Sequence, residues 1–369
     1  MTKPRICFLT DYMTTGGLEK VVCQAIEILH TDYDITVQAL FGGVDKNIAE
    51  MIGTKAKIIS ETKKFGHLCL ASVPLAGGWY LKHLLKDRYD FLIVLRPWFV
   101  MAPYSFAATK VIYWCHSDKD TMYAERSHLG FIRKLNWLRL RMGYRRFDAV
   151  WVVNDYIREK IKTAFGIRHV LTLHNPIEFS VIEEYAQEPT EEDVFASDAI
   201  NFVSVGRLSA EKGHLRLLQA MRDLKDTYKC RLILIGDGDQ RTALEEKVSL
   251  YGLENGVHFL GSKENPYPYM RSADALVIPS RIESFGLVAL EAMAVRTPII
   301  MTDTIGGRIV TDQGKYGLLV DNSTEGVVDG MRRFLEDPDY GHSDTDRAYE
   351  WAHTFDIGVF AERIKALLQ

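Results

Sequence analysis

The feature that most restricts the fold of this sequence is a regular alternation of short apolar runs with longer amphipathic segments. The segment after the first apolar run places Leu18, Val22, Ala25 and Leu29 on one helical face. Strands that are joined through helices pair in parallel and are covered on both faces, so the alternation predicts a doubly wound α/β domain. The seven apolar runs of the first half lie at 5–10, 35–40, 57–60, 91–95, 111–116, 149–154 and 170–173.

The same alternation returns in the second half, where four apolar runs alternate with helical patterns, at 200–205, 232–235, 275–278 and 298–301. An acidic, irregular stretch from Pro176 to Asp198 separates the two halves and is typical of a linker. We therefore expect two domains, residues 1–175 and 176–348, which suits a chain of 369 residues. An amphipathic pattern at 349–369 predicts a final helix.

Charge, cysteine and hydropathy patterns exclude several classes of protein. The net charge of −4 gives no basic footprint for nucleic acid, so we expect no nucleic-acid partner. The sequence has neither a signal-peptide pattern nor an apolar run long enough to cross a membrane, which predicts a cytoplasmic protein. The five cysteines are widely spaced without a C-x-x-C pair, which indicates reduced thiols: Cys7, Cys23, Cys69, Cys115 and Cys230.

The strongest candidate site is the stretch IPSRIESFGLVALEAMAVRTPII at 278–300. A buried strand ends there, a polar turn carries Glu283, and a helix begins near Gly286. Helix N-termini present unsatisfied amides and a partial positive charge, which predicts an anion site at the amides of Gly286, Leu287 and Val288. Glu291 follows Glu283 by two helical turns and lies on about the same side. Taken alone, such a pair is more often structural, with Glu283 as a capping charge at the helix N-terminus and Glu291 as a solvated helix residue.

The second domain also supplies cations, in the stretch GRLSAEKG at 206–213 after the strand at 200–205. Arg207 offers a planar fork that suits phosphate oxygens, and Lys212 offers a compact charge one loop away. Either residue alone is explained by a solvated surface charge. A helix begins after this stretch, near His214.

The order G-R-L-S-x-E-K-G and then E-x7-E resembles the retaining glycosyltransferases of family four, which have the GT-B fold. The resemblance is continuous over residues 201–321 and looser in the first half. It implies two doubly wound, Rossmann-like domains that face each other across a cleft, with the final helix packing back on the first. In that family the first Glu contacts the donor sugar, the second contacts the ribose, and the two cations bind the diphosphate. The implied donor-binding set is Gly16, Gly17, Arg207, Lys212, Ser284, Gly286, Leu287, Val288 and Glu291.

Two features of the first domain gain a function only through this resemblance. Gly16 and Gly17 follow the first strand, where the family has a glycine-rich loop that lets the acceptor and the donor phosphate approach. His116 ends a strand where the family has a histidine that faces the sugar. By itself a lone histidine after a strand is more often structural. One departure is Arg308, which stands where the family usually has Glu.

The segment at 126–146 has an unusual surface pattern, because it contains seven basic residues and no acid. If it is helical, Phe131, Leu135, Leu138 and Met142 form one apolar stripe with basic side chains on both flanks. Two interpretations stay open. The stripe packs on the core and leaves a solvated basic edge, or the segment docks on an anionic membrane surface. The basic residues are Arg126, Arg133, Lys134, Arg139, Arg141, Arg145 and Arg146.

These observations predict a retaining, metal-independent glycosyltransferase without a cofactor, at the inner face of the plasma membrane. It would transfer a hexose from a nucleotide diphosphate sugar, preferably a UDP-sugar, to a hydroxyl of a glycan or lipid-linked acceptor in cell-envelope polysaccharide or glycolipid synthesis. Two other classes stay open. A glycosidase also uses two carboxylates but has no need for Arg207 and Lys212. A catalytically silent subunit would bind nucleotide or glycan without turnover. The predicted catalytic set is His116, Glu283, Arg207 and Lys212.

Overall fold

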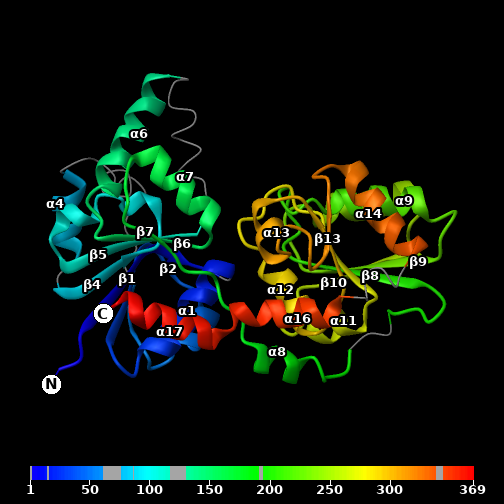
Figure 1. Ribbon diagram of the computed structural model, residues 1–369, viewed down its shortest axis with the longest axis horizontal. Coiled ribbons are helices and arrows are strands. Elements are labelled where there is room, and N and C mark those ends of the chain that lie inside the picture. The colour runs from blue at the N-terminus through cyan, green and yellow to red at the C-terminus, as the bar shows by residue number, and fades with distance from the viewer. Residues whose placement is uncertain are drawn as a thin grey trace. The chain divides into compact units, whose positions relative to one another are not determined.

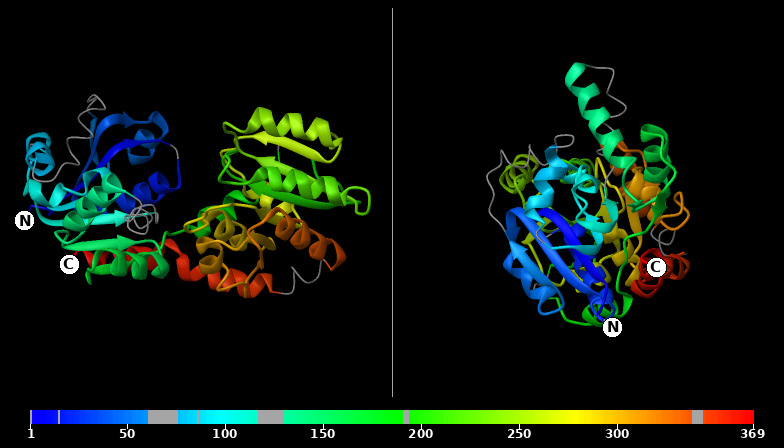
Figure 2. Two further views of the ribbon diagram at one scale, coloured as in Figure 1. Left: turned by 90° about the horizontal axis from the view of Figure 1, so that it is seen from above. Right: turned by 90° about the vertical axis from the view of Figure 1, so that its left-hand side faces the viewer.

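The computed structural model describes residues 2–14, 16–60, 76–85, 87–116, 130–190, 194–337 and 344–369. The chain divides into two compact units (Figure 1). The first unit comprises Met1–Asn175 together with Phe360–Gln369, and the second comprises Pro176–Val359. Each unit contains one parallel sheet with helices on both faces, and Figure 2 gives two further views of them.

The sheet of the first unit has seven parallel strands in the order β3-β2-β1-β4-β5-β6-β7. All seven predicted strands are confirmed: β1 (Arg5–Met13), β2 (Asp34–Val44), β3 (Lys57–Ser60), β4 (Tyr89–Val94), β5 (Ala108–Cys115), β6 (Ala149–Val152) and β7 (Val170–Thr172). The connecting helices are α1 (Gly17–Leu29), α2 (Lys46–Ile52), α4 (Ala76–Leu84), η1 (Pro97–Phe99), η2 (Ala102–Ser105), α6 (Phe131–Tyr144) and α7 (Asp155–Phe165). The central strand β1 is buried on both faces, as covered parallel sheets require.

The sheet of the second unit has six parallel strands in the order β10-β9-β8-β11-β12-β13. The strands are β8 (Ile200–Val205), β9 (Cys230–Ile235), β10 (Val257–Gly261), β11 (Ala275–Ile278), β12 (Ile299–Thr302) and β13 (Leu318–Val320). The sequence did not predict the two edge strands, β10 and β13, because both are short and only partly buried. The helices are α8 (Phe179–Tyr185), α9 (His214–Leu224), α10 (Arg241–Tyr251), α11 (Tyr267–Ser272), α12 (Leu287–Ala294), α13 (Ile305–Val310), α14 (Thr324–Glu336) and α16 (Thr345–Ala352).

Both sheets reverse their strand order at one place, between β1 and β4 in the first unit and between β8 and β11 in the second. Ligands of open parallel sheets bind at such switch points, beyond the carboxyl ends of the strands. The loop before α1 and the residues after β4 therefore share one edge of the first sheet. The loops at 206–213 and 279–286 share the corresponding edge of the second.

The prediction of one continuous helix at 349–369 is wrong. The segment forms α16, then a short 3-10 turn η4 (His353–Phe355), and then α17 (Ile357–Leu367). Backbone groups around Asp356 leave the helical pattern because they bond to Ile177: Ile177 donates to Phe355 O at 3.0 Å, and Ile357 donates to Ile177 O at 2.8 Å. Within the first unit, Phe360 of α17 stacks on Trp114 with ring centroids 6.2 Å apart.

Four cysteines are described, and none of these four is in a disulfide. Cys7, Cys23 and Cys115 are buried, and Cys230 is half-buried. Burial raises the pKa of Cys7 to about 12, so this thiol stays protonated. Cys69 lies outside the described residues. Among the helices in the described ranges, none has the length and apolar character needed to cross a membrane.

Helix α6 is attached to the first unit by one face of its C-terminal half. Leu140 and Tyr144 are fully buried there, and the Tyr144 ring stacks on Phe165 with centroids 4.3 Å apart. Gly143 lets the helix approach η1 closely, because a Cβ atom at this position would lie 2.3 Å from Val100 O. The N-terminal half of α6 extends away from the sheet (Figures 1 and 2).

Replacing Gly143 by Ala should destabilise this attachment. The added Cβ would collide with a backbone oxygen, which cannot turn aside as a flexible side chain can. We expect the free energy of unfolding in urea to fall by about 1–3 kcal/mol. The exposed Leu138 on the same helix provides the control, because Leu138→Ala should change the stability by less than about 0.5 kcal/mol. Equal losses in both variants would contradict the close packing.

Candidate functional site

The turn between β11 and α12 has the geometry of an anion site. Gly286 precedes the helix with a φ of 93°, a conformation that side chains rarely adopt, and no side chain caps the helix. Leu287 and Val288 follow as the first helical residues and are half-buried. Their amides have no partner four residues earlier within the helix, so they are free to face an anion in a field that favours negative charge.

The structure brings Lys212 and Glu283 together. Lys212 Nζ lies 2.6 Å from Glu283 Oε2, and the two side chains are 29% and 16% exposed. Lys212 comes from the loop after β8, and Glu283 comes from the turn after β11. The predicted phosphate-binding cation and the predicted sugar-binding carboxylate are therefore hydrogen-bonded to each other. The side chain of Arg207, on the same loop as Lys212, is exposed.

The simpler explanations of the two carboxylates are wrong. Glu291 is only 7% exposed, so it is not a solvated helix residue. Glu283 does not cap α12, because Gly286 holds the cap position without a side-chain hydrogen bond. Ser284 is half-buried in the turn between them. Arg308 of α13, which stands where the resembled family usually has Glu, binds Asp303 in the loop between β12 and α13 at 2.7 Å.

In the first unit, a charged cluster that was not predicted from the sequence lies beside the glycine loop. Arg96 Nη2 donates to Glu19 Oε1 at 2.7 Å, and Arg96 Nε donates to Asp11 Oδ1 at 3.1 Å. Both carboxylates are nearly buried, and burial raises the pKa of Glu19 although Arg96 opposes this shift. Gly16 and Gly17 begin α1 next to this cluster, since a Cβ on Gly16 would lie 2.7 Å from Glu19 Oε2. The sequence feature that could have revealed this cluster is the position of two acidic residues, Asp11 and Glu19, among the apolar residues of β1 and α1.

His116 lies at the end of β5, as expected, but in an environment that keeps it neutral. Burial, and then the positive charge of Arg96, lowers the pKa of His116 to about 3. Its ring lies 4.8 Å from the Trp114 ring, and its buried Nε2 has no hydrogen-bond partner among the described residues. A neutral imidazole with a free nitrogen suits a hydrogen bond to a hydroxyl better than proton abstraction.

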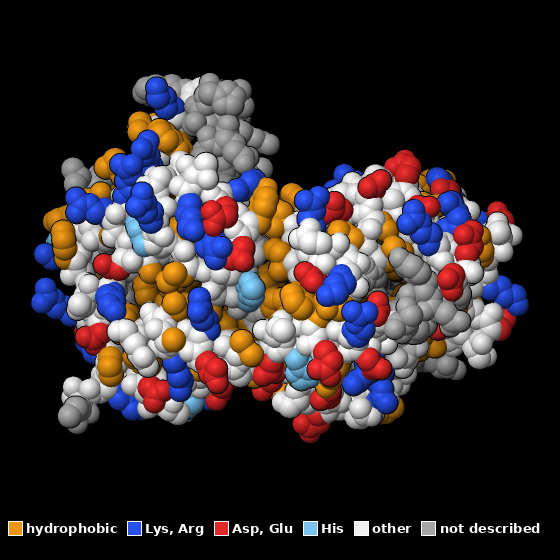
Figure 3. Space-filling view, in the orientation of Figure 1, with side chains coloured by type: hydrophobic (Ala, Val, Ile, Leu, Met, Phe, Trp, Pro, Cys, Tyr) orange, Lys and Arg blue, Asp and Glu red, His pale blue; other side chains and the backbone are white. Residues whose placement is uncertain are grey.

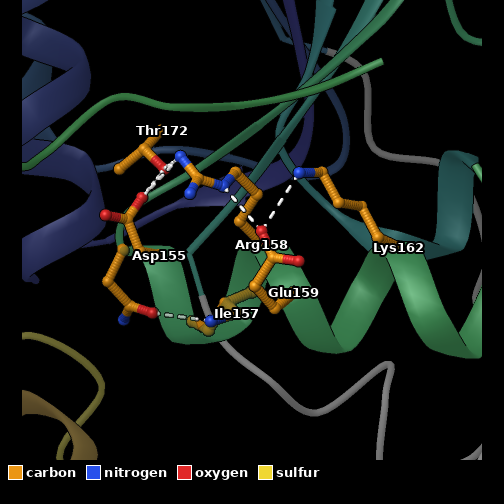
Figure 4. A network of polar contacts seen from close by, with 7 residues as sticks. Asp155, Ile157, Arg158, Glu159, Lys162 and Thr172 are labelled. Atoms are coloured by element: carbon orange, nitrogen blue, oxygen red, sulfur yellow. Dashed lines mark hydrogen bonds and ion pairs between the residues drawn. The ribbon is translucent and has the colours of Figure 1, made fainter. Parts of the chain in front are cut away.

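A second polar network of the first unit, drawn in Figure 4, is structural. Arg158 of α7 binds Asp155 at 2.8 Å and Glu159 at 3.1 Å, and Thr172 of β7 donates to Asp155. Lys162 also binds Glu159, at 3.0 Å. Exposed pairs of this kind contribute little to stability, because solvent screens their charges. Asn154 caps the N-terminus of α7 by accepting a hydrogen bond from Ile157 N at 2.7 Å, so this network lacks the uncapped helix terminus that follows β11.

The chemistry available at the second-unit turn is charge stabilisation. Lys212, Arg207 and the first amides of α12 can surround a phosphate, while Glu283 can accept hydroxyl donors. In the parts of the chain that the structure describes, no three His, Cys, Asp or Glu side chains gather as metal ligands do. Metal independence stays a prediction.

Two family models match the chain, one in each half. The model described as Glycosyltransferase Family 4 matches residues 15–181. The model described as Glycosyl transferases group 1 matches residues 187–351, which include the candidate turn and its cations.

Two curated relatives differ in how much they share with the chain. The uncharacterized glycosyltransferase MJ1059 of Methanocaldococcus jannaschii is 26% identical over 231 residues, which cover 57% of this chain and 56% of the relative. The chain thus spans little more than half of that relative. The N-acetylgalactosamine-N,N'-diacetylbacillosaminyl-diphospho-undecaprenol 4-alpha-N-acetylgalactosaminyltransferase of Campylobacter jejuni is 25% identical over 363 residues, or 96% of both proteins.

A solved structure supports the fold. The crystal structure of Anabaena Alr3699/HepE in complex with UDP matches with a TM-score of 0.79 and 20% identity, and the match covers 99% of both chains. At this identity the likeness concerns the fold alone. With the two parallel sheets, it confirms the predicted GT-B fold class.

The neutral state of His214 predicts a pH dependence of stability. His214 is 3% exposed beside Lys212, and burial, then the lysine charge, lowers its pKa from 6.5 to about 4. Between these values the unfolded chain binds a proton that the folded chain does not, so stability falls as the pH drops from 6.5 towards 4. At pH 5 the loss from this group should be about 2 kcal/mol.

Urea unfolding at pH 7.5 and pH 5 tests this expectation. Wild type should lose about 2 kcal/mol more than His214→Asn, which has no titrating ring. The same change at the exposed His83 should preserve the wild-type pH dependence. Identical pH dependence in wild type and His214→Asn would contradict the expectation.

Proposed function

Because the chain belongs to the group 1 glycosyltransferases of family four, we propose that it transfers a hexose, with retention, from a nucleotide diphosphate sugar to a hydroxyl of a glycan or lipid-linked acceptor. UDP is the preferred nucleotide, and the product belongs to cell-envelope polysaccharide or glycolipid synthesis. The observation that carries this proposal is the Lys212–Glu283 pair beside the N-terminus of α12.

The diphosphate would occupy the cationic side of this site. Arg207 and Lys212 bind its oxygens, and the amides of Leu287 and Val288 face the phosphate at the helix terminus. The helix amides are already in place before reaction, so they can stabilise the charge that develops on the departing diphosphate without reorganisation. Preorganised positive charge of this kind is the reason that we propose catalysis without a metal or cofactor.

Donor binding would change the partner of Lys212. Without donor its ammonium group is 2.6 Å from Glu283. A diphosphate carries more negative charge than one carboxylate, so it would draw Lys212 away and leave Glu283 to accept hydroxyls of the sugar. Glu291, buried on α12, would bind the ribose hydroxyls.

Retention is explained by attack on the face that the diphosphate leaves. The acceptor oxygen forms a bond to the anomeric carbon as the bond from that carbon to the phosphate oxygen breaks. The acceptor proton passes to the departing phosphate oxygen. In this scheme His116 donates or accepts a hydrogen bond to a sugar hydroxyl as a neutral ring, and Gly16 and Gly17 leave room for the phosphate and the acceptor.

The relatives support the choice of substrates. HepE has been crystallised with UDP and with UDP-glucose, which favours a uridine donor. The name of the Campylobacter relative specifies a diphospho-undecaprenol-linked acceptor, which favours a lipid-linked acceptor. The alternative is a catalytically silent subunit that binds nucleotide or glycan. Nucleotide binding by the purified chain, with no UDP release from any UDP-sugar and acceptor, would favour that alternative.

An acceptor in a membrane requires an enzyme that reaches the membrane surface, and α6 has the properties for this. Its apolar stripe is not packed on the core, because Leu135, Leu138 and Met142 are 56%, 41% and 40% exposed. Basic side chains flank the stripe, and Figure 3 shows both kinds together over α6. We propose that α6 docks on anionic lipid at the inner face of the plasma membrane. Arg126 and the side chains of Phe131 and Arg133 lie outside the described residues.

The diphosphate-binding role of the cations predicts the effect of removing them. Arg207→Ala and Lys212→Ala should each lower kcat/KM by an amount that corresponds to about 2.7–4 kcal/mol, as loss of one oxyanion donor does. UDP release from a panel of UDP-sugars measures this effect. Lys229 is 77% exposed in the same unit and serves as the control. Lys229→Ala should keep the wild-type kcat/KM. Wild-type kcat/KM in both loop variants would refute the assignment.

The docking role of α6 predicts salt-sensitive binding to vesicles that contain phosphatidylglycerol. Each basic residue near such a surface contributes about 1 kcal/mol, so changing Lys134, Arg141 and Arg145 together to Glu should weaken cosedimentation by at least about 3 kcal/mol. High salt should weaken binding of the native chain.

A matched triple variant controls for net charge. Lys46, Lys57 and Arg168 are exposed elsewhere in the first unit, and changing them together to Glu alters the charge equally. This control should bind vesicles nearly as well as wild type. Equal binding by the α6 variant and wild type, or no binding by wild type at low salt, would overturn the proposal.

A further inference from the structure

The turn that carries Glu283 is held by three side chains from three different elements. Three consecutive carbonyl oxygens of the turn each accept a hydrogen bond from one of them. Arg216 of α9 donates to Pro279 O at 3.1 Å, Thr302 of β12 donates to Ser280 O at 2.6 Å, and Asn322 after β13 donates to Arg281 O at 3.0 Å. We call Arg216, Thr302 and Asn322 the carbonyl clamp.

The members of the clamp are themselves fixed. Arg216 also donates to the side-chain oxygen of Asn322 at 2.7 Å and to its backbone oxygen at 3.2 Å. Thr302 is fully buried, and Arg216 is 6% exposed. Rigid neighbours therefore set the position of the turn, and few alternative rotamers are open to the clamp.

Backbone bonds secure both ends of the same turn. Arg281 N donates to Glu211 O at 2.8 Å, in the loop of Lys212, and Gly306 N donates to Glu283 O at 2.8 Å. The carboxylate of Glu283 thus projects from a residue whose own backbone oxygen is bonded and which lies two positions after the bonded Arg281. Catalytic groups need this degree of positioning, because a displacement of about 1 Å can reduce the rate about 100-fold.

The charge of Arg216 is unusual for a buried arginine. Buried cations are generally paired with a carboxylate, yet within the described residues Arg216 forms no ion pair and bonds only to carbonyl and amide oxygens. Its hydrogen-bond partners are neutral, and the acid whose negative charge acts on it is Glu325 of α14.

We propose that the carbonyl clamp positions Glu283 for transfer, so that Arg216, Thr302 and Asn322 are positioning residues of the reaction. This inference rests on the proposed function. The competing explanation is that the clamp only satisfies buried carbonyl groups, as buried backbone requires everywhere. The two explanations predict different effects of removing a clamp donor. If the clamp positions Glu283, kcat falls, whereas if the clamp only satisfies buried carbonyl groups, the protein loses stability but keeps its kcat.

Thr302 allows the sharpest test. Thr302→Val keeps the shape of the side chain but removes the donor to Ser280 O, whereas Thr302→Ser keeps the hydroxyl. We expect Thr302→Val to lower kcat about tenfold or more, with less than about a threefold change in donor KM, and Thr302→Ser to restore kcat to within about threefold of wild type. UDP release at saturating UDP-sugar measures both constants.

Thr297 provides a matched control, because it is also buried in the second unit and donates to a backbone carbonyl, Met270 O, at 2.8 Å. Thr297→Val should lower Tm to a similar extent as Thr302→Val and keep wild-type kcat. Arg216→Lys provides a second clamp variant, which keeps the charge but loses the planar fork. It should also lower kcat about tenfold.

A double-mutant cycle shows whether the clamp acts through Glu283. In the Glu283→Gln background, Thr302→Val should reduce kcat by less than about threefold further, because the group that it positions is already impaired. Full additivity, or wild-type kcat in both Thr302→Val and Arg216→Lys, would overturn the clamp. Wild-type kcat in Glu283→Gln would instead refute the proposed function itself.

Discussion

The parallel pairing of β8 with β11 is the constraint on which the candidate site depends. Ala275 and Leu276 of β11 lie in register with Phe202 and Val203 of β8, so the loops after both strands leave the sheet at one edge. That register brings Lys212 and Glu283 into contact although they are distant in sequence. The candidate site is thus an oppositely charged pair beside the N-terminus of α12.

Local patterns were sufficient to predict most of the strands, because short apolar runs and helical periodicity are properties of neighbouring residues. They failed where a partner distant in sequence decides the structure. The last helix breaks at Asp356 because Ile177 takes its backbone bonds, and the edge strands β10 and β13 are defined by their neighbours in the sheet. Lys212 and Glu283 were each identified as candidates because they lie in extended motifs, but their contact with each other was not predicted. Arg96, Arg216 and Thr302 were missed because each is a single residue whose role depends on contacts made in the fold.

Helix α6 shows how one pattern can support two opposite interpretations. Its sequence has apolar residues on two faces, and periodicity alone did not show which face meets the core. Leu140, Gly143 and Tyr144 are the buried ones, whereas Leu135, Leu138 and Met142 are exposed. The buried face is fixed by the close backbone approach at Gly143 and by the stacking of the Tyr144 ring on Phe165. Neither contact can be recognised from the sequence.

The return of α17 to the first unit affects the order in which the protein folds during synthesis. Phe360 and Ile364 are almost fully buried, and Phe360 stacks on Trp114, yet the ribosome makes them after the whole of the second unit. Domains generally fold as units, starting from the N-terminus. Here the first unit keeps an unfilled apolar surface around Trp114 until the second unit has been synthesised. The first half of the chain is therefore translated first but completes its core last.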